Sequence, residues 1–377
     1  MTRGLDASSF RMCQVHRVAM RDPGDTSAVE RLIDEGVIDA ATIIAILGKT
    51  EGNGCVNDFT RQYAVSALQN MLARRLGKSP QEIERTIAMV MSGGTEGGLS
   101  PHFLVICVRA SESAPRQAKA LAAGAAFTRE FLPEELGRMA QVEATAQAVR
   151  EAIAQADIED LADVHYVQVK CPLLTSERVA DAHRRGQSVA THDTYHSMGL
   201  SRAASALGVA LALGELAPAA VAEAAIGRDT TLWSGRASTS SGVELTRNEV
   251  MVLGNSRRWA GDLVIGHAVM QDPIDLPAVF KALATVGLEA HGQLGPDQQS
   301  RIAAVLAKAE PPRSGVIRDR RHIMLDDSDI QATRHARAVV GGVIAAAVGQ
   351  TDIFVSGGAE HQGPDGGGPV AVIARQG

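Results

Sequence analysis

Aromatic residues and closely spaced cysteines are scarce in this chain of 377 residues. Aromatic residues make up only 3%, which leaves few of the flat side chains on which proteins stack single-stranded nucleic acids. The four cysteines lie far apart and form no C-x-x-C motif, which argues against a disulfide framework or a zinc cluster and favours a reducing compartment. No apolar run reaches the roughly 18 residues of a membrane span, and the first residues lack the apolar core of a signal peptide. We therefore expect a cytoplasmic protein with no membrane segment.

The overall composition is typical of a globular protein. Hydrophobic residues make up 45% of the sequence and charged residues 21%. The net charge is −6 and the pI is near 6.0, so the broad positive field of nucleic-acid-binding proteins is missing. At about 100–200 residues per domain, the length predicts two or three units. The composition indicates an enzyme or an oligomeric scaffold that binds neither nucleic acids nor membranes.

Lysine is also rare, with six lysines against 31 arginines, and three of the six end apolar, strand-like runs. These runs cover residues 43–49, 164–170 and 302–308 and end in Lys49, Lys170 and Lys308. In a second recurring segment, Ser or Thr and then arginine precede an alanine-rich stretch, at Thr60-Arg61, Ser201-Arg202 and Thr333-Arg334. Because Ser and Thr are good N-caps, we expect each arginine in the first turn of a helix.

A third recurring segment reads Ser-[Gly/Ser]-Gly-x-Glu and begins at Ser92, Ser240 and Ser356. Each copy precedes an apolar run that we expect to be a strand, at residues 103–108, 263–269 and 369–373. The three segments recur in the same order, about one third of the chain apart. The sequence therefore predicts an α/β fold of three modules, near residues 1–111, 118–257 and 262–377, arranged with pseudo-threefold symmetry around one central site.

The threefold recurrence is what points to a site, because each element alone has a simpler explanation. A lysine at a strand end usually reaches solvent, and Ser-Gly-Gly is usually a turn. Three copies of each, on modules related by symmetry, would converge on one axis. A pocket there would be cationic and rich in hydroxyl and backbone N–H groups.

Five segments resemble those of the ring-opening cyclic amide hydrolases, the family of the cyanuric acid hydrolases and barbiturases. They cover residues 48–58, 91–97, 168–174, 321–329 and 356–364. The resemblance extends over essentially the whole chain. It implies a three-repeat fold with a single active site on the pseudo-threefold axis, and a homotetramer. It also implies hydrolysis of cyanuric acid to carboxybiuret, which loses CO₂ to give biuret in s-triazine degradation.

A Ser–Lys pair suits this chemistry. A serine hydroxyl is a weak nucleophile that needs an adjacent base, and a lysine serves only if burial and nearby positive charge lower its pKa. The three modules look alike, so residue chemistry leaves the catalytic pair open. The resemblance indicates Lys170 as the general base and Ser240 as the nucleophile, with Ser241 as a rival nucleophile. The resemblance also implies that the reaction needs no catalytic cofactor. The expected substrate-binding residues are Arg61, Ser92, Gly93, Arg202, Ser240, Ser241, Arg334, Ser356 and Gly357, together with Lys49 and Lys308.

The last module contains a glycine-rich loop at residues 357–369. Its spacing alone favours a flexible turn, although exposed carbonyl oxygens suit Mg²⁺ or Ca²⁺. The resemblance implies that the loop holds a structural Mg²⁺ or Ca²⁺. The ligands would be Glu310, Ala359, Gln362, Gly363, Pro364 and Gly367.

Two alternatives to cyanuric acid hydrolysis remain. A barbiturase would open barbituric acid to ureidomalonate, but Arg202 completes a triad with Arg61 and Arg334, and the motif at Ser356 matches that at Ser92. We therefore predict cyanuric acid as the substrate and barbituric acid as a poor one. The non-enzyme alternative is a three-module protein that binds a small molecule without converting it.

Overall fold

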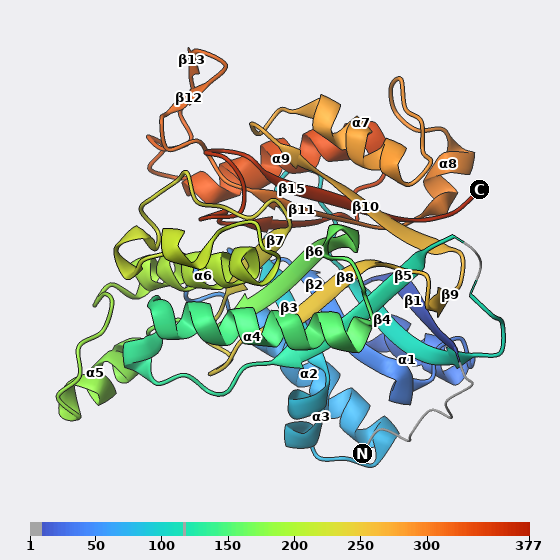
Figure 1. Ribbon diagram of the computed structural model, residues 1–377, viewed down its shortest axis with the longest axis horizontal. Helices are drawn as coiled ribbons and strands as arrows, with labels where there is room; N and C mark the ends of the chain where they lie inside the picture. The colour runs from blue at the N-terminus through green and yellow to red at the C-terminus, as the bar shows by residue number, and fades with distance from the viewer. Residues whose placement is uncertain (1–9, 116–117) are drawn as a thin grey trace.

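The protein is a mixed α/β molecule, as the sequence predicts. A computed structural model describes residues 10–115 and 118–377. Figure 1 shows the strands gathered in the middle of the molecule with helices on the outside. Helices α7, α8 and α9 lie on one side, α1, α2 and α3 on the opposite side, and α4 and α6 cross the front (Figure 1). These outer helices are α1 (Ser27–Asp34), α2 (Phe59–Leu76), α3 (Pro80–Thr86), α4 (Met139–Ala156), α6 (Thr194–Ala212), α7 (Leu276–Thr285), α8 (Pro296–Arg301) and α9 (Ala332–Val348).

Three sheets contain nearly all the strands, and four strands in each follow the same order. The first sheet has the order β1 (Phe10–Ala19), β4 (His102–Ser111), β2 (Ile43–Thr50), β3 (Ala88–Gly93), with the short β9 (Trp259–Ala260) added beside β1. The second has the order β5 (Ala120–Phe127), β8 (Glu249–Ser256), β6 (Val164–Cys171), β7 (Ala237–Ser241). The third has the order β10 (Leu263–Met270), β15 (Gly368–Arg375), β11 (Ile302–Ala309), β14 (Phe354–Gly357).

The strand directions also agree among the sheets. In each sheet the first two pairings are antiparallel and the last one is parallel. Smaller elements complete the fold. They are the hairpin β12 (Val316–Ile317) and β13 (Arg320–Arg321), helix α5 (Ser176–Arg184) and the 3₁₀ turns at Ala40–Thr42, Pro133–Glu135, Leu161–Asp163, Pro218–Ala220 and Glu223–Ala225. Figure 1 shows the hairpin and α5 at the edge of the molecule.

The core explains why the three lysine strands are mostly apolar. Side chains alternate between the two faces of a strand, so a strand that is buried on both faces is apolar at most of its positions. In β2, Ala45 and Leu47 join a central core shared by all three sheets, whereas Ile46 packs toward α2 and α3. The side chains of β11 likewise pack on one face into the central core and on the other into a cluster with α7 and α9. Lys49 has the same parity as Leu47, which directs it toward the centre of the molecule.

Two local expectations from the sequence are wrong. The strand after the Ser240 motif is β8, which pairs with β6, whereas residues 263–269 form most of β10 in the third sheet. Both runs are apolar, so the hydropathy pattern could not show which of them belongs to the same sheet as the Ser240 motif. The helix N-caps are Asp58, Asp193 and Gln331 rather than the Ser and Thr residues. Arg61 and Arg334 do lie in first turns, but α6 begins at Thr194, which places Arg202 in mid-helix.

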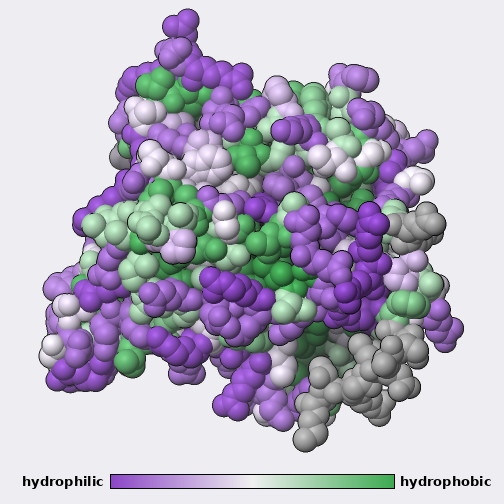
Figure 2. Space-filling view, in the orientation of Figure 1, coloured by the Kyte–Doolittle hydropathy of each residue, from purple (hydrophilic) through white to green (hydrophobic). Residues whose placement is uncertain are grey.

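The helices and the surface of the described residues can be compared with those expected of a membrane protein and of a water-exposed one. None of the helices there is both long and apolar enough to cross a bilayer. Figure 2 shows hydrophilic residues over much of one face, with hydrophobic patches between them near α4 and α6. Mixed surfaces of this kind are normal, because apolar atoms always contribute much of a folded protein's exposed area.

Candidate active site

Each lysine singled out in the sequence lies directly opposite a serine on the neighbouring parallel strand. The register pairs Lys49 with Ser92, Lys170 with Ser240, and Lys308 with Ser356. All six residues are buried. The three Ser–Lys pairs predicted from the repeats therefore occupy equivalent positions in the three sheets.

The ammonium groups link the sheets to one another. Lys49 Nζ donates to the carbonyl oxygen of Val355 in the third sheet at 2.7 Å. Lys170 Nζ donates to Met91 O in the first sheet, and Lys308 Nζ donates to Thr239 O in the second, both at 2.7 Å. Each acceptor immediately precedes a serine of the site, so every lysine also touches the next sheet's serine strand. We call this set of three contacts the lysine ring.

The residues after the serines also face the lysines. Lys49 Nζ donates to the carbonyl of Gly93 at 3.4 Å, and Lys308 Nζ to that of Gly357 at 3.1 Å. Lys170 Nζ donates to the carbonyl of Ser241 at 3.4 Å. Gly93, Ser241 and Gly357 thus take equivalent places, next to Ser92, Ser240 and Ser356.

The three lysines differ in their charge environment. Burial, followed by the charge of Arg337, lowers the pKa of Lys49 well below its usual value. Burial, followed by the charge of Arg202, does the same to the pKa of Lys308. Burial and Arg61 also lower the pKa of Lys170, but the carboxylate of Glu244 opposes that shift. All three lysines are therefore shifted toward the neutral amine that a general base requires.

The hydroxyl groups differ as well. Ser92 Oγ and Ser356 Oγ accept from Lys49 and Lys308 at 3.4 Å and 3.2 Å. Ser240 Oγ is buried and has no hydrogen-bond partner among the described residues. Ser241 Oγ accepts from Arg202 Nη1 at 3.2 Å. Buried polar atoms are nearly always satisfied, so the unpaired hydroxyl of Ser240, opposite Lys170, is an exception among the three serines.

Arginine–glutamate pairs form a second set of contacts, each between a helix and the segment that follows the serine strand of another sheet. Arg202 binds both oxygens of Glu360, with Nε–Oε2 at 2.8 Å and Nη2–Oε1 at 2.6 Å. Arg61 Nε lies 3.7 Å from Glu244 Oε1. Each glutamate is the last residue of a Ser-[Gly/Ser]-Gly-x-Glu motif, and each arginine comes from the helix of another part of the chain. The sequence contained these glutamates in its repeat, but their role in pairing was missed.

The third glutamate, Glu96, contacts two arginines of α9. Arg337 is buried and binds both carboxylate oxygens, with Nε–Oε2 at 2.7 Å and Nη2–Oε1 at 2.6 Å. Arg334 is 40% exposed and makes a single contact at 3.1 Å. Sequence reasoning missed Arg337, whose bidentate contact matches that of Arg202 on Glu360.

Glycines make room for these guanidinium groups. Gly94 and Gly358 have φ values of +106° and +81°, in the region that favours glycine. A Cβ atom at Gly94 would collide with Arg337, and one at Gly358 with Arg202. The third residue of the serine motif is therefore glycine at both positions for steric as well as conformational reasons.

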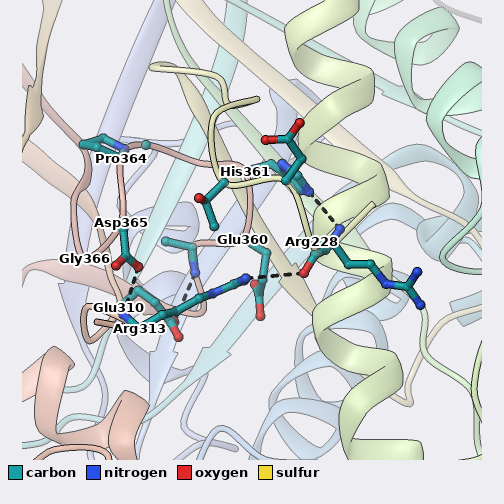
Figure 3. Close-up of a pocket in the computed structure, with 13 residues that line it drawn as sticks. Arg228, Glu310, Arg313, Glu360, His361, Pro364, Asp365 and Gly366 are labelled. Atoms are coloured by element: carbon teal, nitrogen blue, oxygen red, sulfur yellow. Dashed lines mark hydrogen bonds between the residues drawn. The ribbon is translucent and has the colours of Figure 1, made fainter. Parts of the chain in front are cut away.

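The glycine-rich loop lines a small pocket on the third sheet, shown in Figure 3. Glu310, Glu360 and Asp365 contribute carboxylates to its wall. Burial, and then the negative charge of Glu360, raise the pKa of Glu310 to about 7. Among the described residues, the hydrogen bond that Glu310 Oε2 accepts is a long one, from the Ala359 N–H at 3.2 Å. A buried carboxylate repelled by its neighbour is the environment that a bound cation would stabilise.

The predicted metal ligands fit a hard cation in chemical type. The side-chain oxygen of Gln362 already accepts from the Thr239 N–H at 2.7 Å, so its backbone carbonyl remains for a cation. Gly363 has a φ of +137°, and a Cβ there would lie 2.7 Å from Gly368 Cα. Within residues 10–115 and 118–377, no group of three or more His, Cys, Asp and Glu side chains could hold a metal. Any ion here would depend on Glu310 and backbone oxygens.

Comparisons with known proteins agree with this geometry. The sequence model of a family described as "Amidohydrolase ring-opening protein" matches residues 14–375. A cyanuric acid amidohydrolase of Enterobacter cloacae is 56% identical over 365 residues, covering 96% of this chain and 99% of the relative. One from Bradyrhizobium sp. (strain ORS 375) is 56% identical over 372 residues, covering 98% and 99%.

Solved structures agree over the same length. A cyanuric acid hydrolase, reported as an evolutionary innovation by structural concatenation, superposes with a TM-score of 0.93 at 50% identity, covering 97% of this chain and 100% of the other. The cyanuric acid hydrolase from A. caulinodans gives a TM-score of 0.90 at 55% identity, covering 97% and 99%. This chain belongs to the family of ring-opening amidohydrolases.

Proposed function

We propose that this protein opens the ring of cyanuric acid by hydrolysis. The observation that carries the proposal is the set of three buried Ser–Lys pairs in equivalent registers, held together by the lysine ring. Cyanuric acid repeats one C=O and one N–H three times around a planar ring, so a site with three equivalent sets of donors matches it. The names of the curated relatives at 51–56% identity support the same substrate.

We propose further that the three modules surround a pseudo-threefold axis. The shared strand order, the shared Lys–Ser register and the cyclic lysine contacts support this arrangement. The strands of each four-stranded set lie within one of the ranges 1–111, 118–257 and 262–377. The axis would pass between the three Ser–Lys pairs.

In the proposed mechanism Ser240 is the nucleophile and Lys170 is the general base. Neutral Lys170 accepts the hydroxyl proton while Ser240 Oγ attacks a ring carbonyl carbon, which forms a tetrahedral oxyanion. The C–N bond then breaks, and the Lys170 ammonium returns a proton to the leaving nitrogen. Water hydrolyses the acyl-enzyme to carboxybiuret, which loses CO₂ to give biuret. An enzyme that forms biuret in this way would act in s-triazine degradation.

The remaining residues would bind the substrate. Backbone N–H groups in the turns after the serines are suitable donors to ring carbonyl oxygens and to the oxyanion. The hydroxyls of Ser92 and Ser356 and the side-chain amino groups of Lys49 and Lys308 would hold the other two repeats of the ring. Arg61, Arg202 and a third arginine on α9 would supply positive charge. Contacts to Glu96 favour Arg337 for this third place over the more exposed Arg334.

We also propose a structural Mg²⁺ or Ca²⁺ at the glycine-rich loop and a homotetrameric, cytoplasmic enzyme. The buried, repelled carboxylate of Glu310 supports the cation site. When bound, the ion would neutralise Glu310 and hold the loop against the third sheet. The assembly and location rest on the family resemblance, and light scattering at assay concentration tests the tetramer.

Steady-state kinetics on cyanuric acid and barbituric acid test the proposed function most directly. Barbituric acid has a CH₂ group where cyanuric acid has one of its three ring N–H groups, so it lacks one of the three hydrogen-bond donors of cyanuric acid. We expect a kcat/KM for barbituric acid that is lower by about 5–150-fold, because a lost hydrogen bond that leaves a buried group unpaired costs about 1–3 kcal/mol. A preference for barbituric acid would replace the proposal with a barbiturase. Stoichiometric binding without biuret formation would indicate a binding protein.

A further inference from the structure

The three Ser–Lys pairs are alike in register but differ in one contact to a carboxylate. Lys170 Nζ lies 3.0 Å from Glu244 Oε1. For Lys49 and Lys308, the hydrogen bonds in the described structure go only to hydroxyl and carbonyl oxygens. The middle pair is therefore the one whose lysine directly faces a negative charge.

Glu244 occupies this place because its side chain turns differently from those of its two counterparts. Glu96 binds Arg337 with both oxygens, and Glu360 binds Arg202 in the same way. Glu244 instead approaches Arg61 only to 3.7 Å and turns toward the lysine of its own sheet. Neither of its oxygens has a partner with hydrogen-bond geometry among the described residues, although both are buried.

The Lys170–Glu244 contact is also closed to solvent. The side chains of Lys170, Glu244 and Arg61 are exposed by only 1%, 5% and 2%. Charges at this depth are poorly screened, so a carboxylate 3 Å away strongly favours the ammonium form of the lysine. Without such a partner, a buried lysine beside an arginine becomes a poor proton acceptor.

We infer that Glu244 is a positioning residue whose carboxylate holds the Lys170 side chain and selects the Lys170–Ser240 pair as the one that reacts. The inference rests on the proposed Ser–Lys mechanism. Its basis is that Lys170 forms a direct ion pair with a carboxylate, at 3.0 Å. In the part of the chain that the structure describes, Lys49 and Lys308 form no such pair, and the carboxylates that raise their pKa values most, Glu96 for Lys49 and Glu360 for Lys308, act without a direct contact.

The role follows from the proton balance of the step. When the Ser240 O–H proton moves to Lys170, a neutral amine becomes an ammonium ion while the new C–O bond forms. Glu244 stays ionised throughout and stabilises that ammonium, as a buried carboxylate stabilises the imidazolium of a serine hydrolase triad. The ammonium then protonates the leaving nitrogen, which restores the neutral amine.

Four ionisable groups face Lys170 from the elements packed around it. Glu244 favours its ammonium form, and Arg61 on α2 opposes it. Cys171 is the next residue of β6, and burial raises the pKa of its thiol. Glu249, opposite Lys170 on β8, has a pKa raised to about 8 by burial, so its carboxyl is neutral at lower pH. Below about pH 8, Glu244 is thus the negatively charged member of these four groups.

The test is the pH dependence of kcat/KM for cyanuric acid in Glu244→Gln, with Glu96→Gln as the matched control. Loss of the Glu244 charge lowers the pKa of Lys170, so the acidic limb should move to lower pH by about one unit or more. We expect kcat to fall about 10–100-fold, as for the loss of effective general-base catalysis, with a smaller change in KM. Glu96→Gln removes a carboxylate that contacts arginines only, so its acidic limb should remain at the wild-type position.

An acidic limb that stays in place in folded Glu244→Gln, or moves equally in Glu96→Gln, would overturn the inference. If Glu244→Gln does not fold, Glu244→Asp against Glu96→Asp provides the same comparison. The shorter side chain should move the limb in the same direction by less, and an unchanged limb and kcat would again refute the role.

Two reference measurements separate this inference from the proposed function. Wild-type turnover of cyanuric acid and loss of turnover in Ser240→Ala must both hold. If either fails, the Ser240–Lys170 mechanism is wrong and the role of Glu244 is refuted with it. If both hold, an unmoved acidic limb refutes only the role of Glu244.

Discussion

Replacing Arg337 by alanine should destabilise the protein far more than replacing Arg334, although both side chains contact Glu96. Arg337 is 3% exposed and binds both carboxylate oxygens, and its Nη2 also donates to the Asn53 carbonyl at 3.3 Å. Arg334 is 40% exposed and makes one contact. Removal of Arg337 therefore leaves a largely buried carboxylate without its main partner.

The expected magnitudes differ clearly. Breaking a buried ion pair by removing one partner costs about 3–5 kcal/mol, because the remaining charge stays desolvated. An exposed pair contributes about 0–1 kcal/mol. We expect the free energy of unfolding to fall by about 3–5 kcal/mol in Arg337→Ala and by less than about 1 kcal/mol in Arg334→Ala.

Urea unfolding followed by circular dichroism measures both changes against the wild type. Arg337→Met is the control for packing, since it keeps an alkyl stem while removing the charge. Equal losses in the two alanine variants would refute the geometric argument. A loss in Arg337→Ala that Arg337→Met fully restores would assign the effect to packing instead of the ion pair.

Three further predictions concern the serines, the histidines and the metal. Ser240→Ala should lower kcat by a factor on the order of 10⁴–10⁶, whereas Ser92→Ala and Ser356→Ala should cost about 10–10³-fold, as side-by-side kinetics would show. Similar small losses in all three would contradict a covalent mechanism. His165 Nδ1 and His267 Nδ1 lie 2.9 Å apart, and burial lowers the pKa of both rings to about 4. The unfolded chain, with histidine pKa near 6.5, then binds more protons, so stability should fall as the pH drops from about 6.5 to 4. His267→Gln should flatten that dependence in urea titrations at several pH values. Treatment with a chelator should lower the midpoint of thermal unfolding, and Mg²⁺ or Ca²⁺ should restore it; an unchanged midpoint would argue against the structural ion.

The position of the site could be predicted from sequence because it depends on local order within each repeat. Lys170 and Ser240 end buried strands, and alternation along a strand fixes which face each side chain takes. Their register opposite one another then follows from two parallel strands ending at the same edge of a sheet. The same reasoning located the other two pairs.

The contacts between the repeats could not be predicted in this way. Arg334 and Arg337 are three residues apart, so they share a face of α9 and both can reach one carboxylate. Only the packing of α9 against the segment that follows β3 buries one of them. Glu244 and Glu360 end the same motif, yet one faces a lysine and the other an arginine. This choice depends on side-chain packing over long sequence separations.

The lysine ring has a consequence for how such a chain could arise. Its contacts run head to tail, from the first sheet to the third, from the third to the second, and from the second to the first. A heterologous contact that closes after three steps is the interface of a cyclic C₃ trimer. A single repeat unit could form the same ring only by assembling with two copies of itself. Joining three units in one chain keeps that closed interface while allowing each copy to change separately, which is how one Ser–Lys pair can gain a direct contact to its motif glutamate while the other two motif glutamates bind arginines.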